Sequence, residues 1–326
     1  MQMTRRDFMK IAGVASGALV LGGGLFGSMW AAGRLDIQGT FSKQRLSNGV
    51  EMPILGFGAY GKNMSGDATK DTEAVMEAIN VGFKHIGVFK AEEAVGNALV
   101  KSGAPRDELF ISLQIDSKNI KSDDEYIAAF NESLAKLKTD YVDLLCLFIP
   151  DGERLDKATL NNKINIWLAM ERLYNEKRVR ALGVSNLQFE NYEKFLSECK
   201  VAPVVNQMLF NPYSFSDAES RYASSRKMQV ATFVPFGFGT DLIYEPVVTK
   251  IAKKYDKSAE QVLIRWNLQK DYLTMAGSSD LNKVREYSDV FNFTLAPKDF
   301  KAISNLKKRV QTRSVRPTQS TQAKKA

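Results

Sequence analysis

Short apolar runs alternate with amphipathic helical segments eight times along this chain, and the alternation restricts the fold more than any other feature. The first runs cover residues 55–58 and 86–89, and the last covers residues 273–276. The segment 124–137 between two such runs places its apolar side chains at the spacing of one helix face. Strands that alternate with helices form βα units with a parallel sheet. Eight such units predict an α/β fold, a closed (β/α)8 TIM barrel.

A β-hairpin is predicted in front of the first strand. Asn48 and Gly49 stand between apolar residues in the stretch 46–53, and Asn-Gly is the strongest short-range hairpin signal. Near the other end, residues 247–268 carry a helical pattern and are predicted as one helical segment. No internal repeat or proline-rich linker interrupts residues 34–306, which predicts a single domain over this range.

The formal charge of +8 comes from the two ends of the chain. Arg5, Arg6 and Lys10 lie near the start. Seven lysines and arginines follow Leu306, and no acidic residue stands among them. The body between is close to neutral, which argues against nucleic acid as a partner. Residues 307–326 lack apolar periodicity and are predicted to be a basic disordered tail, either a solubilising end or a contact with anionic lipid.

Residues 1–33 have the pattern of an export leader. Thr4 to Lys10 spell T-R-R-D-F-M-K, and an uncharged stretch continues to Gly33. Paired arginines followed by a phenylalanine and an uncharged run are typical of a twin-arginine signal. We therefore expect export to the periplasm or to the outer face of the cytoplasmic membrane. Small residues at Ala31 and Gly33 suit cleavage, whereas a stretch longer than about 18 apolar residues suits an uncleaved membrane anchor.

Cysteine and histidine usage argues against two kinds of site. Cys146 lies in an apolar run and Cys199 ends a predicted helix, and two cysteines are too few for a disulfide framework. Cys146 is expected to be a small buried hydrophobe, and its pairing with Cys199 in an oxidising compartment stays open. His85 is the single histidine of the chain, so no transition-metal site is expected.

Several longer motifs resemble those of one enzyme family. They are A-M-E-R-L-Y-N-E-K-R-V-R-A-L-G-V-S-N (169–186), V-V-N-Q (204–207), N-P-Y (211–213) and Q-V-L-I-R-W (261–266). Together with the hairpin they resemble the aldo-keto reductases over about residues 46–306. The resemblance implies a TIM barrel with an N-terminal β-hairpin and NADPH-dependent reduction of carbonyl compounds. In that reaction a Tyr donates a proton, a Lys paired with an Asp lowers the pKa of the Tyr, and a His orients the carbonyl.

The four groups that carry this reaction in the family are absent from their positions. The Asp position holds Gly87, the Lys position holds Gln114 and the His position holds Phe148. The Tyr falls on a deletion, with Phe89 as the nearest aromatic residue. Since none of these side chains can ionise, we expect the usual carbonyl reduction to be lost.

Tyr60 and Lys90 are the candidates for a substitute acid and the cation that tunes it. Both residues follow predicted strands, on the catalytic side of the predicted barrel. The simpler interpretation makes Tyr60 a wall of the pocket and Lys90 a solvated charge.

The cofactor positions of the family are kept only in part. Those that hold the nicotinamide carboxamide correspond to Ser185, Asn186 and Gln207, and the stacking aromatic residue corresponds to Phe233. The simpler interpretation is that the three polar residues persist only as hydrogen-bonding groups at strand ends.

The adenosine phosphate end of the predicted site is more strongly changed. Gly277 replaces the phosphate-reading Lys, Lys283 replaces an Arg and Tyr287 replaces an Asn, while Ser278 remains. The exchanges remove bidentate recognition of a phosphate. We therefore expect the binding of NADP(H) to be weakened.

The predicted strand ends also carry phenylalanines, namely Phe57, Phe89, Phe148, Phe210 and Phe236. An apolar mouth without an acid suits binding more than catalysis. The first hypothesis is thus an exported pseudoenzyme that binds a small apolar ligand or a protein partner. The second is an NAD(P)H-dependent carbonyl oxidoreductase with a non-standard proton donor. The third is an interaction subunit tethered to the membrane by its N-terminal segment.

Overall fold

The structure is a computed structural model that describes residues 35–306, apart from residues 38, 40, 41, 62, 63, 151–155 and 188 and the side chains of residues 189–191. The predicted export leader (1–33) and the predicted basic tail (307–326) lie outside the described residues.

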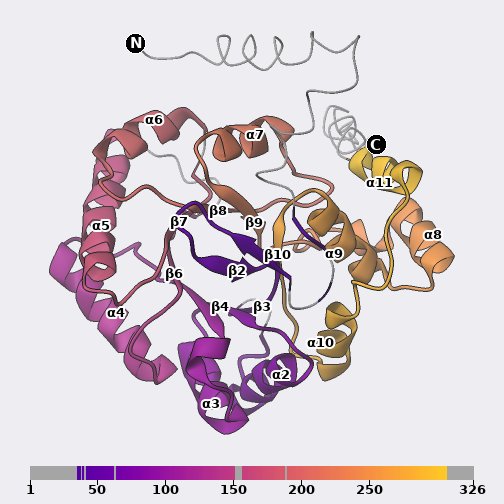
Figure 1. Cartoon of the computed structure of the whole chain (residues 1–326), viewed down its shortest axis with the longest axis horizontal. Helices are drawn as coiled ribbons and strands as arrows, with labels where there is room; N and C mark the ends of the chain where they lie inside the picture. The colour runs from indigo at the N-terminus through magenta and orange to yellow at the C-terminus, as the bar shows by residue number, and fades with distance from the viewer. Residues whose placement is uncertain are drawn as a thin grey trace, which may run out of the picture.

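Eight parallel strands close into a barrel in the order β10-β3-β4-β5-β6-β7-β8-β9 (Figure 1). The strands are β3 (Leu55–Tyr60), β4 (His85–Phe89), β5 (Phe110–Gln114), β6 (Leu144–Leu147), β7 (Leu182–Ser185), β8 (Val205–Met208), β9 (Gln229–Thr232) and β10 (Leu273–Ala276). Closure pairs the last strand with the first, with Thr274 opposite Leu55. The predicted TIM barrel is confirmed.

Helices surround the barrel and cover the outer faces of its strands (Figure 1). They are α2 (Ala68–Asn80), α3 (Glu92–Ser102), α4 (Asp123–Leu137), α5 (Lys157–Asn175), α6 (Phe189–Glu198), α7 (Asp217–Ser225), α8 (Pro246–Tyr255), α9 (Ala259–Gln269), α10 (Leu281–Ser288) and α11 (Pro297–Ser304), with 3-10 turns η1 (Arg106–Glu108) and η2 (Leu242–Tyr244). Over residues 35–306, none of the described helices has the length and apolar character that a membrane crossing requires.

The prediction of one helical segment over 247–268 was wrong, because the chain breaks there into α8 and α9. Asp256 ends α8 in the left-handed conformation, with φ of 52°. Ser258 then starts α9, and its side chain accepts a hydrogen bond from the backbone of Gln261 while the Gln261 side chain bonds back to Ser258. This capping box stabilises a new helix start two residues after the first helix ends.

The predicted hairpin is present. Strands β1 (Lys43–Arg45) and β2 (Glu51–Pro53) pair in antiparallel register, with Gly49 in the turn at φ of +88°. Such a φ suits glycine because it has no Cβ. Met52 of β2 is fully buried, so the hairpin packs onto the rest of the fold. Both cysteine thiols are free, and Cys146 is buried in β6.

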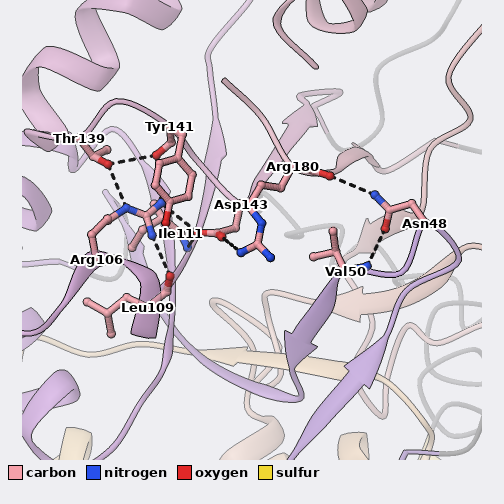
Figure 2. A network of polar contacts seen from close by, with 9 residues as sticks. All are labelled: Asn48, Val50, Arg106, Leu109, Ile111, Thr139, Tyr141, Asp143 and Arg180. Atoms are coloured by element: carbon pink, nitrogen blue, oxygen red, sulfur yellow. Dashed lines mark hydrogen bonds and ion pairs between the residues drawn. The ribbon is translucent and has the colours of Figure 1, made fainter. Parts of the chain in front are cut away.

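A buried carboxylate connects the amino-terminal ends of three neighbouring strands (Figure 2). Asp143, which precedes β6, is fully buried and forms ion pairs with Arg106 at 2.9 Å and Arg180 at 2.6 Å. It also accepts the backbone N–H of Ile111 in β5 at 2.8 Å. The backbone carbonyl of Arg180 accepts a hydrogen bond from Asn48 of the hairpin at 3.1 Å, so the same network reaches the β1–β2 turn.

Candidate functional site

The carboxyl ends of the eight strands meet at one end of the barrel, which we call the mouth. In barrels of this kind the chemistry takes place at this end. The strand ends bring together Gly87, Phe89, Gln114, Phe148, Ser185, Gln207 and Phe233, all of them predicted site positions.

The ring of Tyr60 fills the space above two inward-facing glycines. A Cβ atom on Gly58 would lie 2.7 Å from a ring carbon of Tyr60, and one on Gly87 would lie 2.6 Å from its hydroxyl oxygen. These contacts are too short for real Cβ atoms, so the present packing depends on glycine at both positions. Gly87, where the family has its Asp, therefore cannot carry a carboxylate unless Tyr60 moves.

The hydroxyl of Tyr60 is buried and has no hydrogen-bond partner within the part of the chain that the structure describes. Burial raises the pKa of Tyr60 far above its ordinary value. Lys90, the predicted tuning cation, pairs instead with Asp116 at 2.6 Å at the rim of the mouth. The hydrogen bond from Lys90 also holds the pKa of Asp116 below its ordinary value. The two charges at the rim therefore neutralise each other.

Replacing Tyr60 by phenylalanine is expected to leave stability unchanged or raise it by about 1–2 kcal/mol. An unbonded buried hydroxyl costs about 1–3 kcal/mol of desolvation, and phenylalanine keeps the packing. The measurement is urea unfolding followed by circular dichroism. The matched control is Tyr272→Phe, because the Tyr272 hydroxyl lies 2.8 Å from the Ser220 hydroxyl and its removal should cost about 1 kcal/mol. Equal losses in the two variants would contradict the expectation.

Gln114 and Gln207 are joined by a hydrogen bond across the barrel interior. The side-chain amide of Gln114 donates to the side-chain oxygen of Gln207, and both residues are buried. Their strands, β5 and β8, are separated by β6 and β7 in the barrel, so the contact bridges the mouth. Gln114, in the family's Lys position, is thus hydrogen-bonded to Gln207, the side chain predicted to bind the carboxamide.

Asn186 and Ser185, the other two residues predicted to hold the nicotinamide carboxamide, differ in their hydrogen bonding. Asn186 adopts a left-handed backbone with φ of 52°, and its side-chain amide donates to the carbonyl of Ile149 at 3.0 Å. Ser185 is fully buried, and its hydroxyl oxygen has no partner among the described residues. Of the three predicted carboxamide-binding side chains, only that of Ser185 thus makes no hydrogen bond to the described residues.

Three of the predicted mouth phenylalanines take part in ring contacts near the strand ends. Phe89 and Phe148 have ring centroids 4.7 Å apart, and Phe236 lies 5.1 Å from Tyr287. Phe233, the predicted stacking residue, lies 5.9 Å from the ring of Tyr60. The mouth therefore presents aromatic walls around neutral polar groups.

The assignment of Phe57 and Phe210 to the mouth was wrong. Phe57 packs edge-on against Phe83, which follows α2, and Phe210 packs against Tyr272. Side chains alternate between the two faces of a strand. Because Gly56 and Gly58 face inward, Phe57 between them points to the helix layer, and this periodicity was available in the sequence.

Comparison with known proteins agrees with this barrel fold. A sequence model described as the Aldo/keto reductase family matches residues 54–241, which is more than half of the chain. The chain belongs to the aldo/keto reductase family.

Related proteins of this family include active reductases by name. The glyoxal reductase of Bacillus subtilis (strain 168) is 33% identical over 267 residues, which cover 81% of this chain and 92% of the relative. The crystal structure of an aldo/keto reductase from Brucella melitensis has a TM-score of 0.73 at 29% identity and covers 82% of this chain and 100% of that one. An aldo-keto reductase of Bombyx mori in complex with NADP has a TM-score of 0.70 at 26% identity and covers 81% and 92%.

The aldo/keto reductase barrel of this chain shows two features that the sequence interpretation missed. One is the Gln114–Gln207 bridge, which strand parity could have suggested since both residues are inward-facing polar residues. The other is Glu260, which lies 2.9 Å from the Nζ atom of Lys283, at the predicted phosphate end. Among the described parts of the chain, no group of three or more His, Cys, Asp or Glu side chains could hold a metal ion.

Proposed function

We propose that this member of the aldo/keto reductase family binds a small, largely apolar ligand at the barrel mouth and does not carry out NADPH-dependent carbonyl reduction. The proposal rests on the environment of Tyr60, the candidate substitute for the missing proton donor. Tyr60, whose ring lies over Gly87, is buried, its pKa is raised, and Lys90 pairs with Asp116 instead of lowering that pKa.

The proposed loss follows from what hydride transfer to a carbonyl requires. The carbonyl oxygen gains negative charge as hydride arrives, so the site must supply a proton and stabilise that oxygen. A phenol with a raised pKa releases its proton poorly, and Gln114 carries no charge that could lower the pKa. General acid catalysis contributes about 10²–10⁴-fold in rate, so its loss alone should reduce carbonyl reduction by that factor.

The test compares this protein with the glyoxal reductase of Bacillus subtilis in one assay. With NADPH and glyoxal, the kcat/KM of this protein is expected to be at least about 10³-fold lower than that of the relative. The relative serves as the positive control for substrate and cofactor. Rates within tenfold of the relative would contradict the proposal.

A second candidate function rests on one observation, the unbonded Tyr60 hydroxyl in the barrel interior. In that case the chain is an oxidoreductase in which Tyr60 donates the proton. The Tyr60→Phe variant, which keeps the ring and removes the hydroxyl, distinguishes this second candidate function from the first. Any carbonyl reduction that falls at least about 10²-fold in this variant, with unchanged stability, supports the second candidate over the first.

The proposed site of action is the cell envelope, as the twin-arginine pattern of residues 4–10 suggests. Replacing both Arg5 and Arg6 by lysine should retain the protein in the cytoplasm, as measured by cell fractionation. Mass spectrometry of the exported protein then shows whether the leader has been cleaved. An N-terminus near Arg34 fits a periplasmic binding protein, whereas an intact leader in the membrane fraction fits a tethered interaction subunit.

A further inference from the structure

The end of the mouth between β10 and α10 holds the positions at which the family resemblance places the phosphate-reading residues. Gly277, in the Lys position, follows β10 and lies against the backbone of β3. A Cβ atom there would come within 2.1 Å of the carbonyl oxygen of Gly58. A backbone atom cannot move aside as the tip of a side chain can, so this position excludes a lysine.

Lys283, in the Arg position, is already neutralised by two carboxylates. Its Nζ atom lies 2.9 Å from Glu260 and 3.3 Å from Glu286. The side chain of Glu260 is 14% exposed and that of Glu286 is 26% exposed, so both ion pairs are partly shielded from solvent. Partial burial acts to lower the pKa of Lys283, but its bonds to the two carboxylates outweigh this and hold that pKa above its ordinary value.

The other charges on α10 add no free cation to this end of the mouth. Arg285 pairs with Glu77 of α2 at 2.5 Å. Asp280 caps α10 by accepting the backbone N–H of Asn282 at 2.9 Å. Two carboxylates, on Glu260 and Glu286, thus pair with the single ammonium group of Lys283, and Asp280 adds a third negative charge at the start of α10.

This arrangement does not fit the 2′-phosphate of NADP(H). A phosphate brings negative charge to a region whose own charge is already net negative, and it meets neither a free guanidinium nor a free ammonium group. Carboxylates are hydrogen-bond acceptors, so they suit the hydroxyl groups of an unphosphorylated ribose. The same logic lets an acidic residue select NAD over NADP in other nucleotide-binding folds.

We infer that the β10–α10 end of the mouth selects against a 2′-phosphate, so that NADH binds this protein more tightly than NADPH. The inference concerns binding alone and goes beyond the proposed function. Carbonyl turnover with either nucleotide would overturn the proposed function and leave this preference untouched.

The experiment titrates the full chain with NADH and with NADPH at low ionic strength and follows binding by calorimetry. NADH is expected to bind at least about tenfold more tightly than NADPH. Raising the salt concentration should narrow the difference, because it screens the repulsion between the carboxylates and the phosphate.

The double variant Glu260→Gln/Glu286→Gln releases Lys283 without removing side-chain volume. It is expected to tighten NADPH binding at least about fivefold and to leave NADH binding unchanged or weaker. Glu132→Gln is the control for the loss of a carboxylate charge, since it breaks an exposed ion pair with Lys136 on α4. This control should alter neither affinity.

Three results would overturn the inference. They are NADPH binding as tightly as NADH, no binding of either nucleotide up to about 1 mM, and a double variant, folded by circular dichroism, whose NADPH affinity equals that of the parent.

Discussion

Replacing Asp143 by alanine should lower the free energy of unfolding by about 3 kcal/mol, because it leaves the buried N–H of Ile111 and the half-buried guanidinium group of Arg106 without their acceptor, whereas the exposed Arg180 can turn to solvent. The Asp143 carboxylate is 0% exposed and contacts Arg106 and Arg180 through its two oxygens. It also accepts the backbone N–H of Ile111, so the change affects the β5–β6 junction directly. Figure 2 shows how these groups converge on the carboxylate.

Two comparison variants separate charge from shape in this network. Asp143→Asn keeps the volume and one acceptor, and is expected to lose less stability than Asp143→Ala. Glu108→Gln breaks the exposed ion pair with Lys84 at 2.9 Å and should cost less than about 1 kcal/mol. Urea unfolding of the three variants gives the differences. An Asp143→Ala loss no larger than that of Glu108→Gln would show that the network does not hold the amino-terminal end of the barrel.

Acidification is expected to destabilise the protein through His85, with an effect on the order of 5 kcal/mol between pH 6.5 and 3. The ring of His85 is fully buried in β4, and its Nε2 atom lies 2.8 Å from the hydroxyl oxygen of Ser112. Burial lowers the pKa of His85 to about 3 from an ordinary 6.5. In the unfolded chain the imidazole binds a proton below pH 6.5, whereas in the folded chain it stays neutral. Stability is therefore complete above pH 6.5 and falls as the pH drops toward 3.

The pH dependence is measured best between pH 6.5 and 5, before the carboxylates titrate. The parent should lose about 1.4 kcal/mol per pH unit as the slope approaches one proton. His85→Gln keeps a hydrogen-bonding group near Ser112 and removes the only histidine of the chain, so its stability should be nearly flat over this window. A parent and a variant with the same slope would place the proton uptake on another group.

The order of the elements was predictable because it depends on local patterns. Asn48-Gly49 predicted the hairpin, and the apolar run at residues 273–276 predicted β10 at its observed bounds, Leu273–Ala276. The division of 247–268 into two helices was missed because Asp256 is not a glycine. A left-handed aspartate carries a weaker sequence signal than a left-handed glycine does.

The site was predictable as a set of residue types and positions, but not as a set of contacts. Reading Gly87, Gln114 and Phe148 off the motifs identified side chains that cannot ionise. It did not reveal that Gln114 bonds to Gln207 or that Tyr60 fills the space above Gly87.

The sequence by itself determined the barrel, its hairpin and the identity of the groups at each strand end, because alternation and motif spacing act over short stretches of chain. Only the tertiary structure decided which of those groups are free. Barrel closure brings Gln114 within bonding distance of Gln207, 93 residues away, and folds Tyr60 over Gly87 of the neighbouring strand. A hydrogen bond or a filled cavity depends on distances of a few ångströms between strands, and no pattern along one strand records them.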